Sequence, residues 1–574
     1  MRFAAPHQAA GVAVPPQPWW VRTVVYQICP RSFFDASGDG IGDLAGITAK
    51  LDYLAELGVG TLWLTPFYDS PQRDFGYDIR DFRHVAAEYG SLGDFQSLID
   101  GAHSRGLRVV LDLVLNHTSD EHEWFVEARK GRTNPQRDWY VWRDGRQPAG
   151  QAPPTNWRSL VGGRGWHYDR GSGQWYWAQF LPFQPDLNYR NPDVRRAMLD
   201  IVRYWLDRGV DGFRLDIVNA LLEDASFRDN ARSWRFFPSH QSTGAFFQRP
   251  DRSLNQPETL AFLAELRALI DGYDGRSRFL VGEVVAPLDV ARSYCGDHGE
   301  LLNLVFLFAS LRMPLRARRI RELILQYERQ FPEPLMPTWV FSNHDRLRRI
   351  SRLGGDLQRA KLNAALQLTA RGVPFIYYGE EIGMPQARLP MAQTQDGLAH
   401  RFRRWPQALV DLLRLLAGDS LNRDECRAPM HWSSEQNGGF CPPHARPWIS
   451  VAPAVSARSV AAQQGDERSL LSCYRRFLEA RRASPALSAG ALSLLAASEL
   501  PAGVVGYRRT VAAAGEGEGE VVLVLLNACG RRRSVRISDP SLRLLVSTDV
   551  DRRSPTGGES LVLGPWEGLV LRAR

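Results

Sequence analysis

The chain has 574 residues and a formal charge of +8, from 71 Lys and Arg against 63 Asp and Glu. Its 44% hydrophobic and 23% charged residues are typical of a globular protein and exclude a disordered chain. No apolar stretch approaches the roughly 20 residues that a membrane-spanning helix needs, so we expect no membrane partner. The basic residues are mainly scattered arginines without a recognisable nucleic-acid-binding module, and we expect no nucleic-acid partner.

Residues 1–19 are predicted to be a flexible leader rather than a secretory signal peptide, because Pro15, Pro16 and Pro18 interrupt them. The apolar core of about 7–15 residues that a signal peptide requires is missing. The six cysteines show no C-x-x-C pair and no regular spacing, which indicates reduced and mostly buried thiols. These features predict a cytoplasmic protein.

Short apolar runs alternate with helical periodicity from about Val24 to Tyr378. Between Leu44 and Leu57, for example, leucines and isoleucine recur every three or four residues, which predicts one helix that ends before Gly58. Eight apolar runs are predicted to be strands: Thr23–Pro30, Thr61–Pro66, Arg108–Val114, Asp211–Val218, Arg278–Val284, Asn303–Phe308, Thr338–Asn343 and Val373–Gly379. Eight buried strands separated by helices predict an α/β fold, a closed (β/α)8 TIM barrel.

The alternation is interrupted at residues 117–185, which are rich in Trp, Gly, Pro and Arg and are predicted to be an insertion domain after the third strand. The barrel domain then comprises residues 20–116 and 186–485, and it includes a helix at Leu470–Ala483. Residues 486–574 are predicted to be a C-terminal antiparallel β domain, since they contain the strand-like runs Val521–Asn527 and Ser560–Leu563.

Two further segments are less determined by their pattern. The acidic, Gly-rich stretch Gly515–Glu520 is expected to be a solvated hairpin tip. Residues 386–422 contain a Leu-rich helical stretch near Leu409–Leu416. This segment either covers the side of the site where an acceptor binds or forms a helical hairpin on the surface.

Charged residues stand at the ends of predicted strands whose other residues are apolar. Arg214 and Asp216 are two residues apart and therefore share one face of a strand, where the guanidinium should lower the pKa of the carboxyl. Glu283 has no cation beside it in sequence, and an apolar setting should raise its pKa. One ionised carboxylate and one protonated carboxylic acid are what cleavage of a glycosidic bond requires.

Several segments resemble glycoside hydrolase family 13, the α-amylase family. Its four motif regions are matched by Asp112–Thr118, Gly212–Asn219, Gly282–Val284 and Phe341–Asp345. Gln184–Asn188 resembles the extra motif of the oligo-1,6-glucosidase and α-glucosidase branch. Asn422–Trp432 resembles that branch's RDxxRTPMQW segment, with Ala428 in place of Thr and His431 in place of Gln. The resemblance implies the same three-part architecture.

The resemblance also implies a role for each matching residue. Asp216 would be the nucleophile and Glu283 the acid/base, with Arg214 orienting Asp216. Asp345 would bind the 2- and 3-hydroxyls of the sugar in the −1 subsite, the subsite of the glucose that is transferred.

Four further residues would complete this subsite. His117 and His344 would donate hydrogen bonds to the sugar, and Tyr77 would stack on its face. Asp74 would pair with Arg427 and close the pocket behind the non-reducing end. A closed pocket implies exo action on short substrates.

A metal site is suggested by the segment from Asp35 to Asp43. Oxygen ligands at alternate positions follow the first half of a calcium loop: Asp35, Ser37, Asp39, the Ile41 carbonyl and Asp43. Gly46 stands where an EF-hand has its bidentate Glu, so the loop resembles the structural loop of oligo-1,6-glucosidases instead. We expect structural Ca²⁺ or Mg²⁺ and no organic cofactor, the alternative being a polar turn without an ion.

The sequence predicts a retaining, exo-acting α-glucosidase, a monomer or homodimer, that hydrolyses short α-glucosides of the maltose, isomaltose or sucrose type. The same site could serve an α-glucosyltransferase or a sucrose isomerase, although no RLDRD-like segment occurs near Asn343–Arg352. Trehalose synthesis has no motif support, and a non-catalytic binding protein of this fold is disfavoured because the three carboxylates are present. Ile217, after the nucleophile, resembles the Val that accompanies α-1,6 activity, but Asn219 leaves the linkage open.

Overall fold

The computed structural model describes residues 18–146, 150–235, 244–417, 420–512, 519–537, 539, 541–554 and 560–573. The predicted leader lies outside these ranges except for its last two residues, and Trp19 begins helix α1 (Trp19–Arg22). Residues 515–518 of the predicted hairpin tip lie outside the described residues as well.

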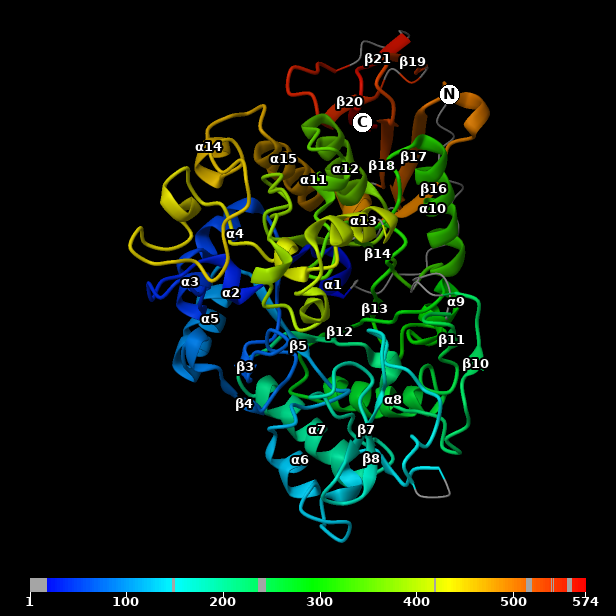
Figure 1. Ribbon diagram of the computed structural model, residues 1–574. Coiled ribbons are helices and arrows are strands. Elements are labelled where there is room, and N and C mark those ends of the chain that lie inside the picture. The colour runs from blue at the N-terminus through cyan, green and yellow to red at the C-terminus, as the bar shows by residue number, and fades with distance from the viewer. Residues whose placement is uncertain are drawn as a thin grey trace.

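Eight parallel strands form the central sheet, in the order β13-β12-β9-β5-β2-β1-β15-β14 (Figure 1). Nearly all of their residues are buried, because helices cover the outside of the sheet and side chains fill its inside. All eight predicted strands are present: β1 (Val25–Ile28), β2 (Thr61–Leu64), β5 (Arg108–Leu113), β9 (Gly212–Leu215), β12 (Phe279–Gly282), β13 (Leu304–Val305), β14 (Thr338–Val340) and β15 (Val373–Tyr377).

Side-chain hydroxyls connect β13 and β14, the two strands at the ends of that order. The Thr338 hydroxyl donates to the Val305 carbonyl at 2.8 Å and accepts from the Leu307 amide at 3.0 Å. The Ser310 hydroxyl donates to the Val340 carbonyl at 2.8 Å. These bonds take the place of a backbone ladder at the seam of the barrel, so backbone groups that would otherwise be buried without partners are satisfied.

The main helices around the barrel are α3 (Leu44–Ala49), α4 (Leu51–Leu57), α5 (Leu92–Ser104), α7 (Pro192–Leu206), α8 (Glu258–Asp271), α10 (Ala317–Gln330), α12 (Leu357–Thr369) and α15 (Leu470–Ala483). The single helix predicted over residues 44–57 is wrong, because Lys50 leaves the helical conformation with φ −109° and ψ 8°. Its ammonium group lies 3.9 Å from the centre of the Phe34 ring, a cation–π contact made at the break.

The segment between β5 and α7 forms a small separate layer. It contains α6 (Glu123–Ala128) and the antiparallel strands β6 (Trp142–Arg143), β7 (Trp166–Asp169) and β8 (Gln174–Trp177). Its core is largely tryptophan, which explains the Trp-rich composition. His117 and Asp186 form a β-bridge, so the chain leaves the barrel and returns to it at neighbouring points.

The C-terminal region consists of antiparallel sheets, as predicted. One sheet has the order β16 (Ala491–Leu494), β17 (Val504–Val511), β18 (Glu520–Asn527), β22 (Gly568–Arg572) and β20 (Arg543–Ser547). A second pairs β19 (Arg533–Arg536) with β21 (Ser560–Leu563). Figure 1 shows these strands at one end of the molecule and the segment with β7 and β8 at the other. The predicted fold class is confirmed.

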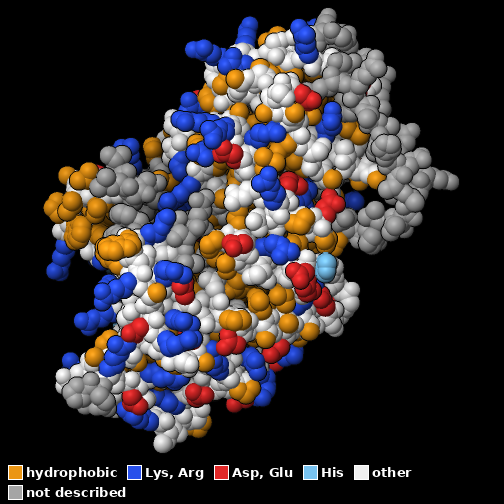
Figure 2. Space-filling model, turned by 90° about the vertical axis from the view of Figure 1, so that its right-hand side faces the viewer, with side chains coloured by type: hydrophobic (Ala, Val, Ile, Leu, Met, Phe, Trp, Pro, Cys, Tyr) orange, Lys and Arg blue, Asp and Glu red, His pale blue; other side chains and the backbone are white. Residues whose placement is uncertain are grey.

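The surface and the thiols agree with the expectations from composition. Figure 2 shows Lys and Arg side chains spread over the visible face, with Asp and Glu among them. All six cysteines are free, and five of them are buried. Within the described ranges, no helix is long and apolar enough to cross a membrane.

Replacing Thr338 with Val should destabilise the seam of the barrel. The change keeps the shape of the side chain but leaves the Leu307 amide and the Val305 carbonyl without this partner. We expect the free energy of unfolding to fall by about 1–3 kcal/mol, measured by urea denaturation. Thr48→Val is the control, because among the described residues the Thr48 hydroxyl bonds only to the Leu44 carbonyl of its own helix. An unchanged midpoint for Thr338→Val would contradict the role of the hydroxyl.

Candidate active site

One buried guanidinium gathers three carboxyl groups at the carboxyl end of the barrel strands. Arg214 lies on β9 and is paired in register with Asp112 on β5. Its Nη1 donates to Asp112 at 2.6 Å and to Asp216 at 2.7 Å, and its Nη2 donates to Glu283. The ladder between β5, β9 and β12 therefore determines where these acids meet.

The carboxyl groups of Asp216 and Glu283 are close to each other. Asp216 contacts Nη1 and Glu283 contacts Nη2 of the same guanidinium, and the pKa of Glu283 is raised by burial and in part by the neighbouring Asp216 charge. Inverting glycosidases separate their carboxyl groups by about 6.5–9.5 Å to admit a water molecule. Contact of both acids with one guanidinium is the arrangement expected of a retaining enzyme.

Burial dominates the ionisation of these two acids. It raises the pKa of Asp216 to about 7 and that of Glu283 to about 7, while the Arg214 charge opposes the shift in both. The raised pKa expected for Glu283 is found. The lowered pKa expected for Asp216 is wrong, because Arg214 is shared with Asp112 and Glu283 and cannot outweigh burial at each of them. The pair holds a proton near neutral pH.

Asp345, in the loop after β14, has the opposite environment. Burial alone would raise its pKa, but the charges of Arg423 and Arg427 hold the pKa well below its usual range. Arg427 donates to its Oδ1 at 2.9 Å, and Arg423 lies 3.4 Å from the same oxygen. Asp345 is therefore ionised. Its side chain is 28% exposed, against 11% for Asp216 and 14% for Glu283, so solvent reaches all three carboxyl groups.

His344 and Tyr77 form a polar chain across the site. The Gln27 amide lies 2.7 Å from His344 Nδ1, which leaves the ring proton on Nε2. Nε2 donates to the Tyr77 hydroxyl at 2.7 Å, and this hydroxyl donates to Asp112 at 2.9 Å. The rings of Tyr77 and His344 stack with an interplanar angle of 6°. His117 Nε2 lies 3.2 Å from the Tyr77 carbonyl, so both predicted histidines contact Tyr77.

Both histidines are neutral at physiological pH. Burial lowers the pKa of His117 to about 3 and that of His344 to about 3. A neutral imidazole can donate one hydrogen bond without adding a charge to the site.

The partner of Asp74 differs from the expected one. Asp74 pairs with Arg423 rather than with Arg427, and its second oxygen accepts from Gln184 at 3.0 Å. Arg427 instead donates to Asp345 and, at 2.8 Å, to the His344 carbonyl. Both arginines belong to the segment Asn422–Trp432, but Arg423 takes the role that was expected of Arg427.

The strand β9 ends in an unusual turn directly after Asp216. Ile217 adopts the left-handed conformation with φ 34° and ψ 48°, which is rare for a β-branched residue and costs about 1–3 kcal/mol. Its side chain is buried in an apolar cluster with Ala220 and Leu254, against which Phe180 packs. Burial of the side chain offsets the strain and stabilises the turn that presents Asp216.

The predicted metal loop is tightly folded. Asp35 accepts hydrogen bonds from the amides of Gly38 and Gly40 at 2.6 and 2.8 Å, and Asp43 accepts from the amides of Ser37 and Gly46 at 2.9 and 2.6 Å. Gly40 has φ +92°, and an added Cβ there would meet the Arg446 carbonyl at 1.9 Å. The loop therefore requires glycine at this position.

Comparison with known proteins gives the family. Residues 27–490 match the model of the alpha amylase catalytic domain. The chain belongs to the α-amylase family. It is 40% identical to a probable alpha-glucosidase of Rhizobium meliloti over 86% of this chain and 88% of that one. It is 35% identical to an oligo-1,6-glucosidase of Heyndrickxia coagulans over 96% and 99% of the two chains.

A solved structure of an alpha-glucosyl transfer enzyme, XgtA, superposes with a TM-score of 0.84 at 37% identity, covering 97% of this chain and 100% of that one. The predicted α-amylase family, its branch of oligo-1,6-glucosidases and α-glucosidases, and the assignment as a glycoside hydrolase are confirmed.

Some residues of this α-amylase-family site did not emerge from the sequence. Asp396 is fully buried and accepts a hydrogen bond from Nη2 of Arg423 at 2.7 Å. It lies in the segment 386–422, which also contacts the insertion through Arg401 and the Val161 carbonyl. Asp396 has no strand end or motif to mark it, whereas Arg423 stood inside the quoted segment Asn422–Trp432. Helix α13 (Gln407–Ala417) of the same segment exposes Leu409 and Leu412, whereas Asp396 reaches Arg423. Whether the segment covers the acceptor side stays a prediction.

The two raised pKa values predict a bell-shaped pH dependence of kcat/KM centred near pH 7. Activity should fall at acid pH as Asp216 becomes protonated and at alkaline pH as Glu283 loses the proton that a natural leaving group needs. Glu283→Gln, assayed on an aryl glucoside with an activated leaving group, should retain the acid limb and lose the alkaline limb.

Glu380→Gln is the matched control, since Glu380 is also buried with its pKa raised to about 7 but contacts Tyr474 away from the site. Its profile should equal that of the parent enzyme. An alkaline limb that persists in Glu283→Gln would show that another group supplies the proton.

Proposed function

We propose that the protein is a retaining, exo-acting α-glucosidase that hydrolyses short α-glucosides of the maltose, isomaltose or sucrose type. The observation that carries the proposal is the contact of Asp216 and Glu283 with one guanidinium, beside an ionised Asp345. A protonated acid and an adjacent nucleophile are what retention by double displacement requires.

The proposed reaction has two steps. Glu283 gives its proton to the glycosidic oxygen while Asp216 attacks the anomeric carbon, and the leaving sugar departs from a β-glucosyl-enzyme. Glu283 then takes a proton from water, which attacks the same carbon, releases α-glucose and frees the Asp216 carboxylate. Arg214 contacts both acids, so its charge is placed to stabilise the carboxylate form of each in turn.

Closure of the site supports the exo part of the proposal. Arg423 joins Asp74 to Asp396 and also lies beside Asp345, so four segments far apart in sequence are connected at one point. We assign this group to the end of the pocket that receives the non-reducing glucose, where a charged pair would bind its 4-hydroxyl. A longer chain could not extend past this ion-pair group.

The same intermediate could pass glucose to a sugar instead of water. The likeness to an alpha-glucosyl transfer enzyme over 97% of the chain favours transglucosylation as the second candidate, and sucrose isomerisation would use the same site. The two outcomes differ only in the acceptor that reaches the intermediate. Chromatography of the products from maltose, isomaltose, sucrose and trehalose at high concentration distinguishes them.

Asp216→Asn should reduce kcat by about 10³-fold or more with little change in thermal stability, because the amide cannot form the glucosyl ester. Asp200→Asn, the same chemical change at a surface position on α7, should leave kcat unchanged. Proton NMR of the first product should show α-glucose. Near-normal turnover of Asp216→Asn, or β-glucose as the first product, would refute the mechanism.

We also propose that the loop from Asp35 to Asp43 binds structural Ca²⁺, with Mg²⁺ as an alternative ion. The described residues contain no group of three or more His, Cys, Asp or Glu suited to a metal, so the proposal rests on a mixed oxygen set. Asp35 and Asp43 are buried, and among the described residues neither forms an ion pair. Two buried carboxylates without a cation, with Ser37 and the Ile41 carbonyl nearby in the loop, fit a hard cation that prefers oxygen ligands.

Removal of the ion should lower the melting temperature. We expect EDTA to reduce Tm by about 3–10 °C and added Ca²⁺ to restore it. Asp39→Asn should remove most of this dependence, whereas Asp52→Asn, on the exposed side of α4, should not. An identical Tm with EDTA and with Ca²⁺ would contradict the assignment. The cytoplasmic location and the monomer or homodimer state stay predictions.

A further inference from the structure

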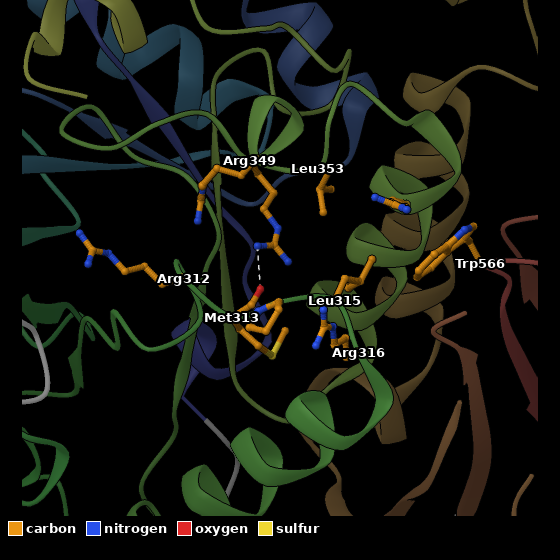
Figure 3. A pocket seen from close by; sticks show the side chains of 10 residues that line it. Arg312, Met313, Leu315, Arg316, Arg349, Leu353 and Trp566 are labelled. Atoms are coloured by element: carbon orange, nitrogen blue, oxygen red, sulfur yellow. Dashed lines mark hydrogen bonds between the residues drawn. The ribbon is translucent and has the colours of Figure 1, made fainter. Parts of the chain in front are cut away.

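A cavity of about 600 Å³ lies away from the catalytic acids, between the loop after β13, helix α11 (Arg349–Arg352), the start of α12 and Trp566 in the turn before β22 (Figure 3). Ten described residues line it; five of them are arginines and none is acidic. Positive charge gathered in a concave site without acidic residues on its wall favours an anionic ligand.

Arg349 forms the floor of this arginine pocket. Its Nε donates to Asn363 at 2.9 Å and its Nη1 to the Met313 carbonyl at 2.9 Å, the bond drawn in Figure 3. Nη2 is buried and has no hydrogen-bond partner among the described residues. The residue is only 4% exposed, and burial, with the neighbouring Arg352 charge, lowers the pKa of Arg349 to about 9. A buried guanidinium with an unused donor is costly unless an acceptor fills the cavity.

The opposite wall is the beginning of helix α10. Arg316 is its N-cap, its side chain is exposed, and it forms no ion pair among the described residues. The first turn of α10 contains no acidic residue, and the Arg316 side chain does not cap its amide groups. The positive end of the helix dipole therefore adds to the charge of the arginines.

The rest of the pocket is lined by apolar side chains that can contact the organic part of a ligand. Leu315, Leu353 and Trp566 supply apolar surface, and the Arg359 guanidinium lies 4.7 Å from the centre of the Trp566 ring. Arg359 also pairs with Asp356 at 3.4 Å, so its charge is partly neutralised, unlike that of Arg349. The cavity is in the range of small-molecule sites, about 300–1,000 Å³, and is larger than an inorganic oxyanion needs.

We propose that the arginine pocket binds a phosphate ester of a small molecule, with the phosphate between Arg349 and Arg316 and the organic group against Trp566. A phosphate monoester carries up to two negative charges and three acceptor oxygens, which matches several guanidinium groups better than a single carboxylate does. The site is separate from the catalytic acids, and the proposal does not depend on the reaction. A connection exists nonetheless, since the Arg349 amide donates to Ser342 in the segment that leads to His344 and Asp345.

Isothermal titration of the full-length protein with AMP, glucose 6-phosphate and inorganic phosphate tests the proposal. At least one ester should bind saturably, about tenfold or more tightly than inorganic phosphate. Arg316→Ala should weaken that ester about fivefold or more. Arg318→Ala is the matched control, because it removes the same charge from the same helix turn at a residue that is 86% exposed and outside the pocket.

Two further variants test the pocket, and one of them does not alter a buried side chain. Arg349→Met should abolish ester binding but removes a buried side chain, so Arg359→Ala, on the half-buried rim, serves as a second pocket variant with an expected loss of about threefold or more. Absence of saturable ester binding, or equal losses in Arg316→Ala and Arg318→Ala, would overturn the proposal. Inorganic phosphate binding as tightly as both esters would overturn the placement of an organic group at Trp566.

Discussion

The chemistry of this protein depends on one buried guanidinium that serves three buried carboxyl groups. Arg214 is 1% exposed and contacts Asp112, Asp216 and Glu283. Three carboxylates beside one cation would leave two uncompensated charges in a buried site, which is costly. A proton held by the pair Asp216 and Glu283 lowers this cost, so the acid that a glycosidase needs follows from a shortage of positive charge. The barrel contributes the register that places the arginine on β9 between the acids of β5 and β12.

The neighbouring acid shows the opposite balance. Asp345 has Arg423 and Arg427 as partners and stays ionised, although it is nearly as close to the centre of the site. Arg423 is shared with Asp74 and Asp396, so two guanidinium groups serve three carboxylates here. The acids around Arg214 and the acids around Arg423 and Arg427 thus differ in protonation because the number of guanidinium groups per carboxyl group differs. This is the separation of acid and base roles by environment that catalytic sites exploit.

The sequence predicted the strands that carry the site residues, but it did not predict which arginine pairs with which acid. Eight apolar runs gave eight strands, and the charged residues at their ends were brought together because parallel strands end on the same side of a barrel. The predicted partner of Asp74 was wrong. Arg423 begins a short 3-10 helix and Arg427 follows its last residue, and in such a turn the spacing of two residues does not determine where their side chains point. The pKa of Asp216 was wrong because local spacing shows that Arg214 is near but not that two other acids share it. The break at Lys50 was missed because two helices joined at one non-helical residue show the same apolar spacing as one continuous helix.

The basic composition also acquires a structural explanation. Several arginines are almost fully buried and donate to backbone carbonyls at the ends of elements rather than facing solvent. Arg509, on β17, donates to the Thr369 carbonyl at the end of α12, and Arg481, on α15, donates to the carbonyls of Leu368 and Gly372. Burial lowers the pKa of Arg481 to about 9 and that of Arg509 to about 10. These guanidinium groups satisfy orphan carbonyls where the C-terminal sheet meets the barrel. Part of the basic composition therefore serves to join the two parts of the chain.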